Sequence, residues 1–118
     1  LMISHTSYAA LGNLPATLSD QALSFAQHQL PNASLLISDD MEMGALGQFE
    51  ATQAALSSLR AGMDMLILSG THRTLHERTT LIREVTTRIK EGSLSSQELD
   101  QKVKKILRAK YAEDLLHK

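Results

Sequence analysis

The sequence contains no cysteine among its 118 residues, and this absence excludes several kinds of chemistry. Disulfide bonds, thiolate metal sites and a cysteine nucleophile are all impossible, while the redox compartment stays undetermined. Long apolar runs are missing too, since none approaches the roughly 18 residues needed to span a bilayer. The remaining composition, 42% hydrophobic and 21% charged, is typical of one compact globular unit.

An excess of charge of either sign is also missing. Twelve basic residues stand against thirteen acidic ones, and the formal net charge is -1. This balance creates no field for nucleic acid or an anionic membrane, so we expect neither as a partner. The first residues lack the basic region and apolar core of a signal peptide, which predicts a cytoplasmic protein. The chain begins inside an apolar run and without an initiator methionine, so we expect it to be a piece of a longer protein.

Three short apolar runs are present, and each is followed by a helical pattern. The runs lie near residues 1–4, 34–38 and 63–68 and are typical of buried strands in a parallel sheet. The predicted helices span residues 19–30, 48–60, 73–91 and a terminal segment that begins at Ser95 and has an apolar stripe reaching Leu115. Strands that recur about every 30 residues match the length of a βαβ unit. The order predicts either a doubly wound sheet or consecutive units of a (β/α)8 barrel.

A polar residue follows each predicted strand: His5, Asp39 and Ser69. Because functional groups of parallel α/β folds gather at the carboxyl ends of strands, we expect these three to share one rim. Asp39 and Asp40 are adjacent, so one would face the active-site mouth and the other the loop or the helix layer. On spacing alone, both acids could equally solvate a turn. A lone histidine such as His5 more commonly has a structural role, and a methionine such as Met41 more commonly packs in a core.

Familiar cofactor motifs are not formed by the residues around these acids. Glu42 adds a third carboxylate, but the spacing lacks the alternating ligands and turn glycine of a calcium loop, so we predict no metal site. Gly44 and Gly47 form neither a GxGxxG motif nor a P-loop, and no nucleotide cofactor is indicated. The further acidic and lysine strand ends of a phosphoacceptor receiver domain are also missing from the sequence.

The segment Ile37–Ala45, with the sequence ISDDMEMGA, resembles the nucleophile segment of family-3 glycoside hydrolases in their bacterial β-N-acetylhexosaminidase branch. Other blocks agree with it in order: Met2–His5 with Tyr8–Leu11, Pro15–Ser19 and Ala61–Leu66. The segment Gln29–Ala33 departs from the family's usual Leu-Gly-Phe-x-Gly. The resemblance covers nearly the whole chain. It implies an α/β fold in which residues 1–118 form the C-terminal portion of a catalytic TIM barrel, with about three βα units plus a terminal helix.

The resemblance also implies a function and a set of site residues. Asp39 would be the nucleophile of a retaining hydrolase that releases terminal β-linked N-acetylhexosamine from an N-acetylglucosaminide, with no cofactor or metal, in peptidoglycan recycling. His5 and Met41 would bind the substrate, and Asp40 would support the loop. The family's general acid/base is a histidine assisted by an aspartate on an earlier loop, and it has no counterpart in this sequence.

Two alternatives to this function stay open at the level of sequence. One is a catalytically inert barrel fragment or interaction module, and the other is a family-3 hydrolase of the β-glucosidase type. If the chain belongs to a hydrolase of either the β-N-acetylhexosaminidase or the β-glucosidase type, its expected partner is the remainder of the barrel, located upstream in the same protein or in an associating chain. The aromatic content of 3% provides few surfaces on which a long polysaccharide could stack.

Overall fold

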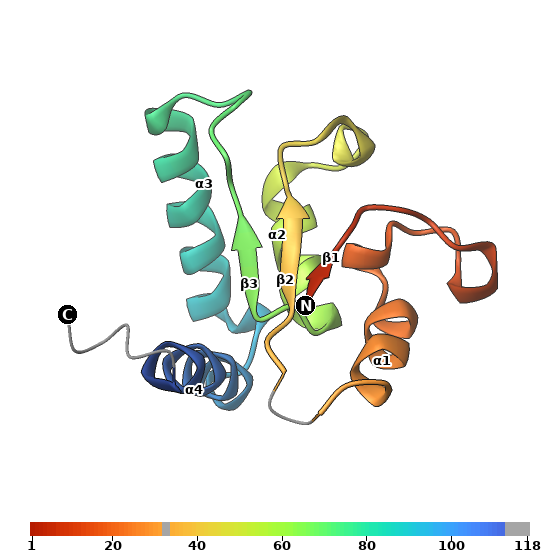
Figure 1. Ribbon diagram of the computed structural model, residues 1–118. Helices are drawn as coiled ribbons and strands as arrows, with labels where there is room; N and C mark the ends of the chain where they lie inside the picture. The colour runs from red at the N-terminus through yellow and green to blue at the C-terminus, as the bar shows by residue number, and fades with distance from the viewer. Residues whose placement is uncertain (32–33, 113–118) are drawn as a thin grey trace.

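The computed structural model describes residues 1–31 and 34–112, which form a parallel sheet with helices packed against it (Figure 1). The strands, in the order β1-β2-β3 and with both pairs parallel, are β1 (Met2–Ile3), β2 (Ile37–Asp40) and β3 (Met65–Ile67). The α-helices are α1 (Asp20–His28), α2 (Ala51–Ala61), α3 (Leu75–Arg88) and α4 (Ser96–Ala112). The prediction of three parallel βα units followed by a terminal helix is therefore confirmed.

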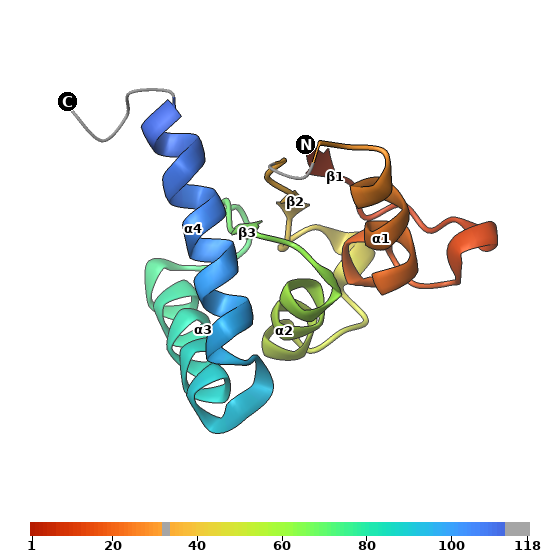
Figure 2. The same cartoon turned by 90° about the horizontal axis from the view of Figure 1, so that it is seen from below.

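One face of the sheet is covered and the other is bare. Leu36, just before β2, packs with Leu23 of α1 and with Met63 before β3, and Ile3 of β1 joins this cluster. Figure 2 shows α1, α2 and α3 in an arc on the same side of the sheet. None of the described helices covers the opposite face, where alternation along β1 places the side chain of Met2, which is 59% exposed. The chain thus has a finished helix layer over one face of the sheet only.

Local capping signals set several helix boundaries where the sequence predicts them. The hydroxyl of Ser19 accepts a hydrogen bond from the amide of Ala22 at 3.2 Å and begins α1. Ser95 and Glu98 form the predicted capping box before α4. Gly62 ends α2 at a φ of 127°, a backbone conformation that side chains disfavour. None of the helices within the described ranges is long and apolar enough to cross a membrane.

Other boundaries differ from the prediction. Helix α2 begins at Ala51 instead of residue 48, because the side chain of Glu50 caps it by accepting from the amides of Thr52 and Gln53. Helix α3 begins at Leu75 instead of residue 73, because Thr74 and Glu77 form a second capping box. Strand β2 continues through Asp40 and does not end at residue 38. The adjacent acids therefore belong to the strand itself.

Helix α4 passes below α3 and lies beside the amino end of β3 (Figures 1 and 2). Lys102 Nζ donates to the carbonyl oxygen of Met63 at 2.8 Å, and Lys105 Nζ lies 3.1 Å from Asp64 Oδ2. The Asp64 carboxylate is buried and also accepts a hydrogen bond from the amide of Leu36 at 2.9 Å. Polar contacts thus hold α4 against the amino ends of β2 and β3.

The apolar stripe predicted for this terminal helix is only partly covered. Leu99 and Ile106 are half-buried, whereas Val103 and Leu107 are exposed. Leu115, the last residue of the predicted stripe, lies outside the described residues.

Candidate active site at the carboxyl ends of the strands

The carboxyl end of β2 contains a β-bulge. Ile37 pairs with Met65 and Asp40 pairs with Ile67, so three steps along β2 correspond to two steps along β3. The hydroxyl of Ser38 occupies the resulting gap and accepts a hydrogen bond from the amide of Ile67 at 3.0 Å. Ser38 is fully buried, and a buried amide needs a hydrogen-bond partner. The Ser38 hydroxyl therefore serves the Ile67 amide in place of a backbone carbonyl of β2.

Asp39 lies within this bulge, and its side chain is partly exposed. Its Oδ1 accepts a hydrogen bond from the amide of Asp40 at 2.8 Å. The amide of the next residue, Met41, bonds the carbonyl of Ile67 at 2.9 Å. Within residues 1–31 and 34–112, no hydrogen bond or ion pair links the Asp39 carboxylate to another strand or loop. Asp39 therefore presents a carboxylate that a ligand can reach.

The Asp40 carboxylate, in contrast, links the loops that follow β2 and β3. Its Oδ1 accepts from the amides of Glu42 at 3.1 Å and Ser69 at 3.2 Å, and its Oδ2 accepts from the Ser69 hydroxyl at 2.5 Å. Burial by itself raises the pKa of Asp40, but the hydrogen bonds from Ser69 and Glu42, with the nearby charge of His72, outweigh burial and lower the pKa. These are the contacts of a residue that supports a loop.

His5 follows β1 and is buried, with 6% of its surface exposed. Its Nε2 lies 2.8 Å from the carbonyl oxygen of Asp40, and its Nδ1 lies 2.6 Å from the Thr17 hydroxyl. A carbonyl oxygen can only accept, so Nε2 carries the proton, and in the neutral ring Nδ1 accepts from Thr17. Both ring nitrogens thus have protein partners, and His5 positions the end of β2. A contact between His5 and a substrate stays a prediction.

Met41 is half-buried and packs against an apolar cluster below the loop. The cluster comprises Leu18, Leu46 and Ala54. The sulfur of Met41 lies 3.9 Å from the hydroxyl of Ser58. These are core contacts, and the assignment of Met41 to substrate binding likewise stays a prediction.

Glu42, the third acid, is buried rather than solvated, with 9% of its surface exposed. Its Oε2 accepts a hydrogen bond from the amide of His72 at 2.9 Å, while its Oε1 has no partner among the described residues. Glu42 therefore adds a second link between the loops after β2 and β3. Within residues 1–31 and 34–112, no group of three histidine, aspartate or glutamate residues is arranged to hold a metal ion.

The ends of the three strands do meet, as predicted, but they meet at Asp40. His5 contacts the carbonyl of Asp40, and Ser69 contacts its carboxylate. Sequence reasoning gave no role to Thr17 or Ser38, although both are fully buried and bonded at this end of the sheet. Thr17 lies in the block Pro15–Ser19 and Ser38 in the segment Ile37–Ala45, but no local pattern in either stretch identifies the hydrogen-bond partner of the side chain.

The contact between Ser69 and Asp40 leads to a prediction about pH. Because the folded-state pKa of Asp40 is lowered, its contribution to stability is present above its ordinary pKa of 3.8 and is lost as the pH falls below that value. Replacing Ser69 with alanine should lower the free energy of unfolding by roughly 1 kcal/mol at neutral pH. The difference between wild type and variant should shrink below pH 3.8. Urea unfolding of a complete barrel that carries residues 1–118, between pH 7 and pH 3, measures this difference.

The control for this experiment is Ser24→Ala, at an exposed position on α1. Its effect on the free energy of unfolding should not vary with pH. A Ser69→Ala difference that stays constant through the acid range would contradict the link between Ser69 and the Asp40 carboxylate.

Comparison with known proteins gives a consistent result. Residues 1–109 match the model of the glycosyl hydrolase family 3 N-terminal domain. CbsA from Thermotoga neapolitana superposes with a TM-score of 0.81 and 26% identity, over 94% of this chain and 24% of its own. LpqI from M tuberculosis has a TM-score of 0.73 and 25% identity, over 86% of this chain and 31% of its own. No curated protein matches the chain in sequence.

A third solved structure, the β-N-acetylglucosaminidase from Thermotoga maritima, has a TM-score of 0.77 at 22% identity, over 91% of this chain and 24% of its own. At that identity the likeness shows the fold alone. The chain spans about a quarter to a third of the length of these three structures. Its sheet and helices form part of a (β/α)8 TIM barrel.

Proposed function

Because the chain belongs to glycosyl hydrolase family 3, we propose that it is the nucleophile-bearing part of a retaining glycoside hydrolase that releases terminal β-linked N-acetylhexosamine. The sugar preference is supported by the segment Ile37–Ala45 and by relatives named as β-N-acetylglucosaminidases. We also propose a role in peptidoglycan recycling, which the resemblance of this segment implies, and a cytoplasmic location, which the sequence predicts from the first residues.

The observation that carries this proposal is the difference between the three acids after β2. Asp40 is held through both carboxylate oxygens, and Glu42 is buried. Asp39 is partly exposed, and of the three acids its carboxylate alone has no bond to another loop among the described residues. A nucleophile must be accessible and must not be neutralised by a close partner, and of the three acids Asp39 meets both conditions.

In the proposed reaction, an Asp39 oxygen attacks the anomeric carbon of the terminal sugar. The bond from that carbon to the leaving oxygen breaks, and a proton donor supplies the leaving oxygen with its hydrogen. Water then attacks the same carbon of the glycosyl-enzyme, releases the sugar with its original configuration and restores the Asp39 carboxylate. His5 acts indirectly in this scheme, because its Nε2 holds the Asp40 carbonyl and so fixes the end of β2.

Substrate preference tests the proposed activity. A complete barrel that carries residues 1–118 as its last three βα units would be assayed on chromogenic β-N-acetylglucosaminide and β-glucoside. We expect kcat/KM to favour the N-acetylglucosaminide by at least about tenfold, because a site built to hydrogen-bond a substrate group rejects the analogue that lacks it. A preference for the plain glucoside would contradict the sugar assignment and favour the β-glucosidase alternative. No turnover of either substrate would favour an inert barrel.

A further inference from the structure

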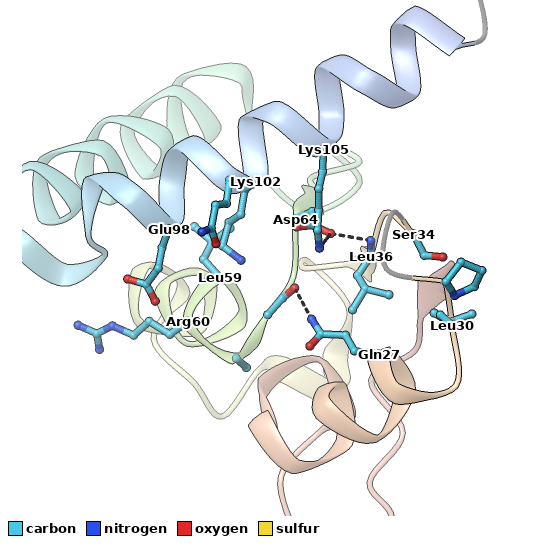
Figure 3. Close-up of a pocket in the computed structure, with 14 residues that line it drawn as sticks. Gln27, Leu30, Ser34, Leu36, Leu59, Arg60, Asp64, Glu98, Lys102 and Lys105 are labelled. Carbon is cyan, nitrogen blue, oxygen red and sulfur yellow. Dashed lines mark hydrogen bonds and ion pairs between the residues drawn. The ribbon is translucent and has the colours of Figure 1, made fainter.

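A cavity of about 440 Å³ lies at the amino ends of β2 and β3, at the opposite end of the sheet from Asp39 (Figure 3). It is lined by the end of α1, by Ser34 and Leu36 before β2, by the turn between α2 and β3, and by one face of α4. Figure 3 shows Lys102 and Lys105 extending from α4 toward this space, with Gln27 on the far side. Its volume lies within the range of sites that bind small molecules.

Two ammonium groups border the cavity from one face of α4. Lys102 and Lys105 are one helical turn apart, and each makes a single assigned contact, with Met63 O at 2.8 Å and with Asp64 Oδ2 at 3.1 Å respectively. A lysine ammonium has three N–H donors. Among the described residues, the other two donors of each ammonium have no hydrogen-bond partner, so they can bind solvent or a ligand.

The positive charges are only partly compensated. Three cations, Arg60, Lys102 and Lys105, line the cavity beside two carboxylates, Asp64 and Glu98. The Asp64 carboxylate pairs with Lys105, whereas Lys102 contacts a neutral carbonyl. Within the described residues, no carboxylate lies within ion-pair distance of Lys102.

The other groups around Lys102 do not remove this imbalance. Burial, together with the like charge of Lys105, lowers the pKa of the Lys102 ammonium, and the opposing charges of Asp64 and Glu98 offset this only in part. The carboxylate of Glu98 accepts from the amide and the hydroxyl of Ser95, so these bonds hold it at the start of α4 and its charge acts on Lys102 from a distance. An anion in the cavity would supply the missing negative charge.

We infer that this cavity binds a small tetrahedral oxyanion, either free phosphate or the phosphate group of a small metabolite. Such a group can accept charge-assisted hydrogen bonds from Lys102 and Lys105 at once. The amides of Gln27 and Gln101 also line the cavity and add neutral N–H donors. The binding site is separate from the proposed glycoside site, since it lies at the amino end of the sheet.

The competing explanation is that the two lysines only stabilise the packing of α4 against the sheet, because residues at the amino end of a barrel more commonly serve stability. This structural role accounts for the bonds from Lys102 to Met63 and from Lys105 to Asp64. It predicts that α4 is held equally well with and without phosphate. The two explanations therefore differ in a measurable quantity.

Titration with inorganic phosphate tests the inference. Binding to a complete barrel that carries residues 1–118 would be followed by calorimetry and thermal unfolding, at an ionic strength balanced with chloride. We expect a dissociation constant in the millimolar range or tighter. Lys102→Gln should weaken binding by about tenfold or more, because it removes a charge-assisted donor. Lys102→Arg keeps the charge and should retain most of the binding.

The matched control is Lys104→Gln, an exposed position between the two cavity lysines that does not line the cavity. Its phosphate affinity should stay within about twofold of wild type, because the exposed Lys104 ammonium does not line the cavity and its charge is screened by solvent and salt. Tighter binding of a small phosphomonoester than of phosphate would identify a metabolite, and equal binding would identify the free ion. Absence of phosphate binding to the complete barrel, or equal weakening by Lys104→Gln and Lys102→Gln, would overturn the inference. No glycoside is present, so the result does not depend on the proposed hydrolase activity.

A second measurement uses the lysines as their own reporters. Pyridoxal phosphate forms an imine with a lysine close to a phosphate site, and borohydride reduces that imine to a stable label. We expect labelling at Lys102 or Lys105 in preference to Lys104 and Lys110, and protection by inorganic phosphate. Uniform labelling of all four lysines would count against the site.

Discussion

Replacing Asp39 with alanine in a complete barrel is expected to lower kcat for glycoside hydrolysis by on the order of 10⁴-fold or more, as removal of a covalent nucleophile commonly does. The structure provides no ready substitute among the neighbouring acids. Both oxygens of Asp40 are bonded, chiefly by Ser69, and Glu42 is buried against the loop after β3. Steady-state kinetics on a chromogenic N-acetylglucosaminide would measure the loss.

Chemical rescue separates loss of the nucleophile from loss of the fold. Azide can enter the space that the Asp39 side chain vacates and attack the anomeric carbon in its place, which should restore turnover of Asp39→Ala and give a glycosyl azide of inverted configuration. Asp20→Ala, an exposed substitution in the first turn of α1, is the control and should leave kcat unchanged. Substantial activity of Asp39→Ala without azide would show that another residue is the nucleophile.

The second large effect concerns the 118 residues by themselves, which are expected not to hydrolyse glycosides at a useful rate. A retaining mechanism needs a proton donor against the leaving oxygen in addition to the nucleophile. Asp40 and Glu42 are held in place by their contacts with the loop after β3, and both ring nitrogens of His5 are engaged. The described residues thus supply one half of the required pair of groups.

Stability points the same way. The outer edges of β1 and β3 are unpaired in the described sheet, and the face opposite the helices is bare. A full (β/α)8 domain takes about 250 residues, so most of the closing strands lie outside this chain. We therefore expect the isolated chain to be poorly soluble, partly unfolded or dependent on association.

Light scattering, thermal unfolding and a chromogenic N-acetylglucosaminide assay would test both expectations on the isolated chain. Addition of a polypeptide that supplies the first five βα units should increase turnover from the background rate. A monomeric chain that melts cooperatively and turns over the substrate alone would refute the expectation, and it would indicate His5 as the acid/base.

Features that depend on neighbours in the sequence were predictable. Ser19, Ser95 and Gly62 act through hydrogen bonds or backbone angles within a few residues, so their helix boundaries follow from local pattern. The parallel strands follow from short apolar runs separated by one crossover length. The start of α3 was also readable, since Thr74 and Glu77 have capping-box spacing, but the prediction began that helix at residue 73.

Features that depend on a distant strand or loop were not predictable. The bulge in β2 exists because the hydroxyl of Ser38 satisfies an amide of β3, and no property of β2 alone specifies that partner. The fixation of His5 depends on Thr17, which lies in a loop 12 residues further along. The rule that strand ends converge placed the acids at the correct rim. It could not predict which of the two aspartates would accept the hydrogen bond from Ser69, because the bulge sets the direction of each side chain.

The bulge at Ser38 also sets how the length of this segment can vary. A regular strand repeats every two residues, and the extra residue in β2 advances its phase by one. Deleting Asp39, the one residue between Ser38 and Asp40, would restore the two-residue period of the strand. Length changes are usually tolerated next to loops, yet here a single deletion would leave one aspartate where the site uses two. An alignment that places a gap inside this triplet would therefore equate Asp39 with a residue of different function.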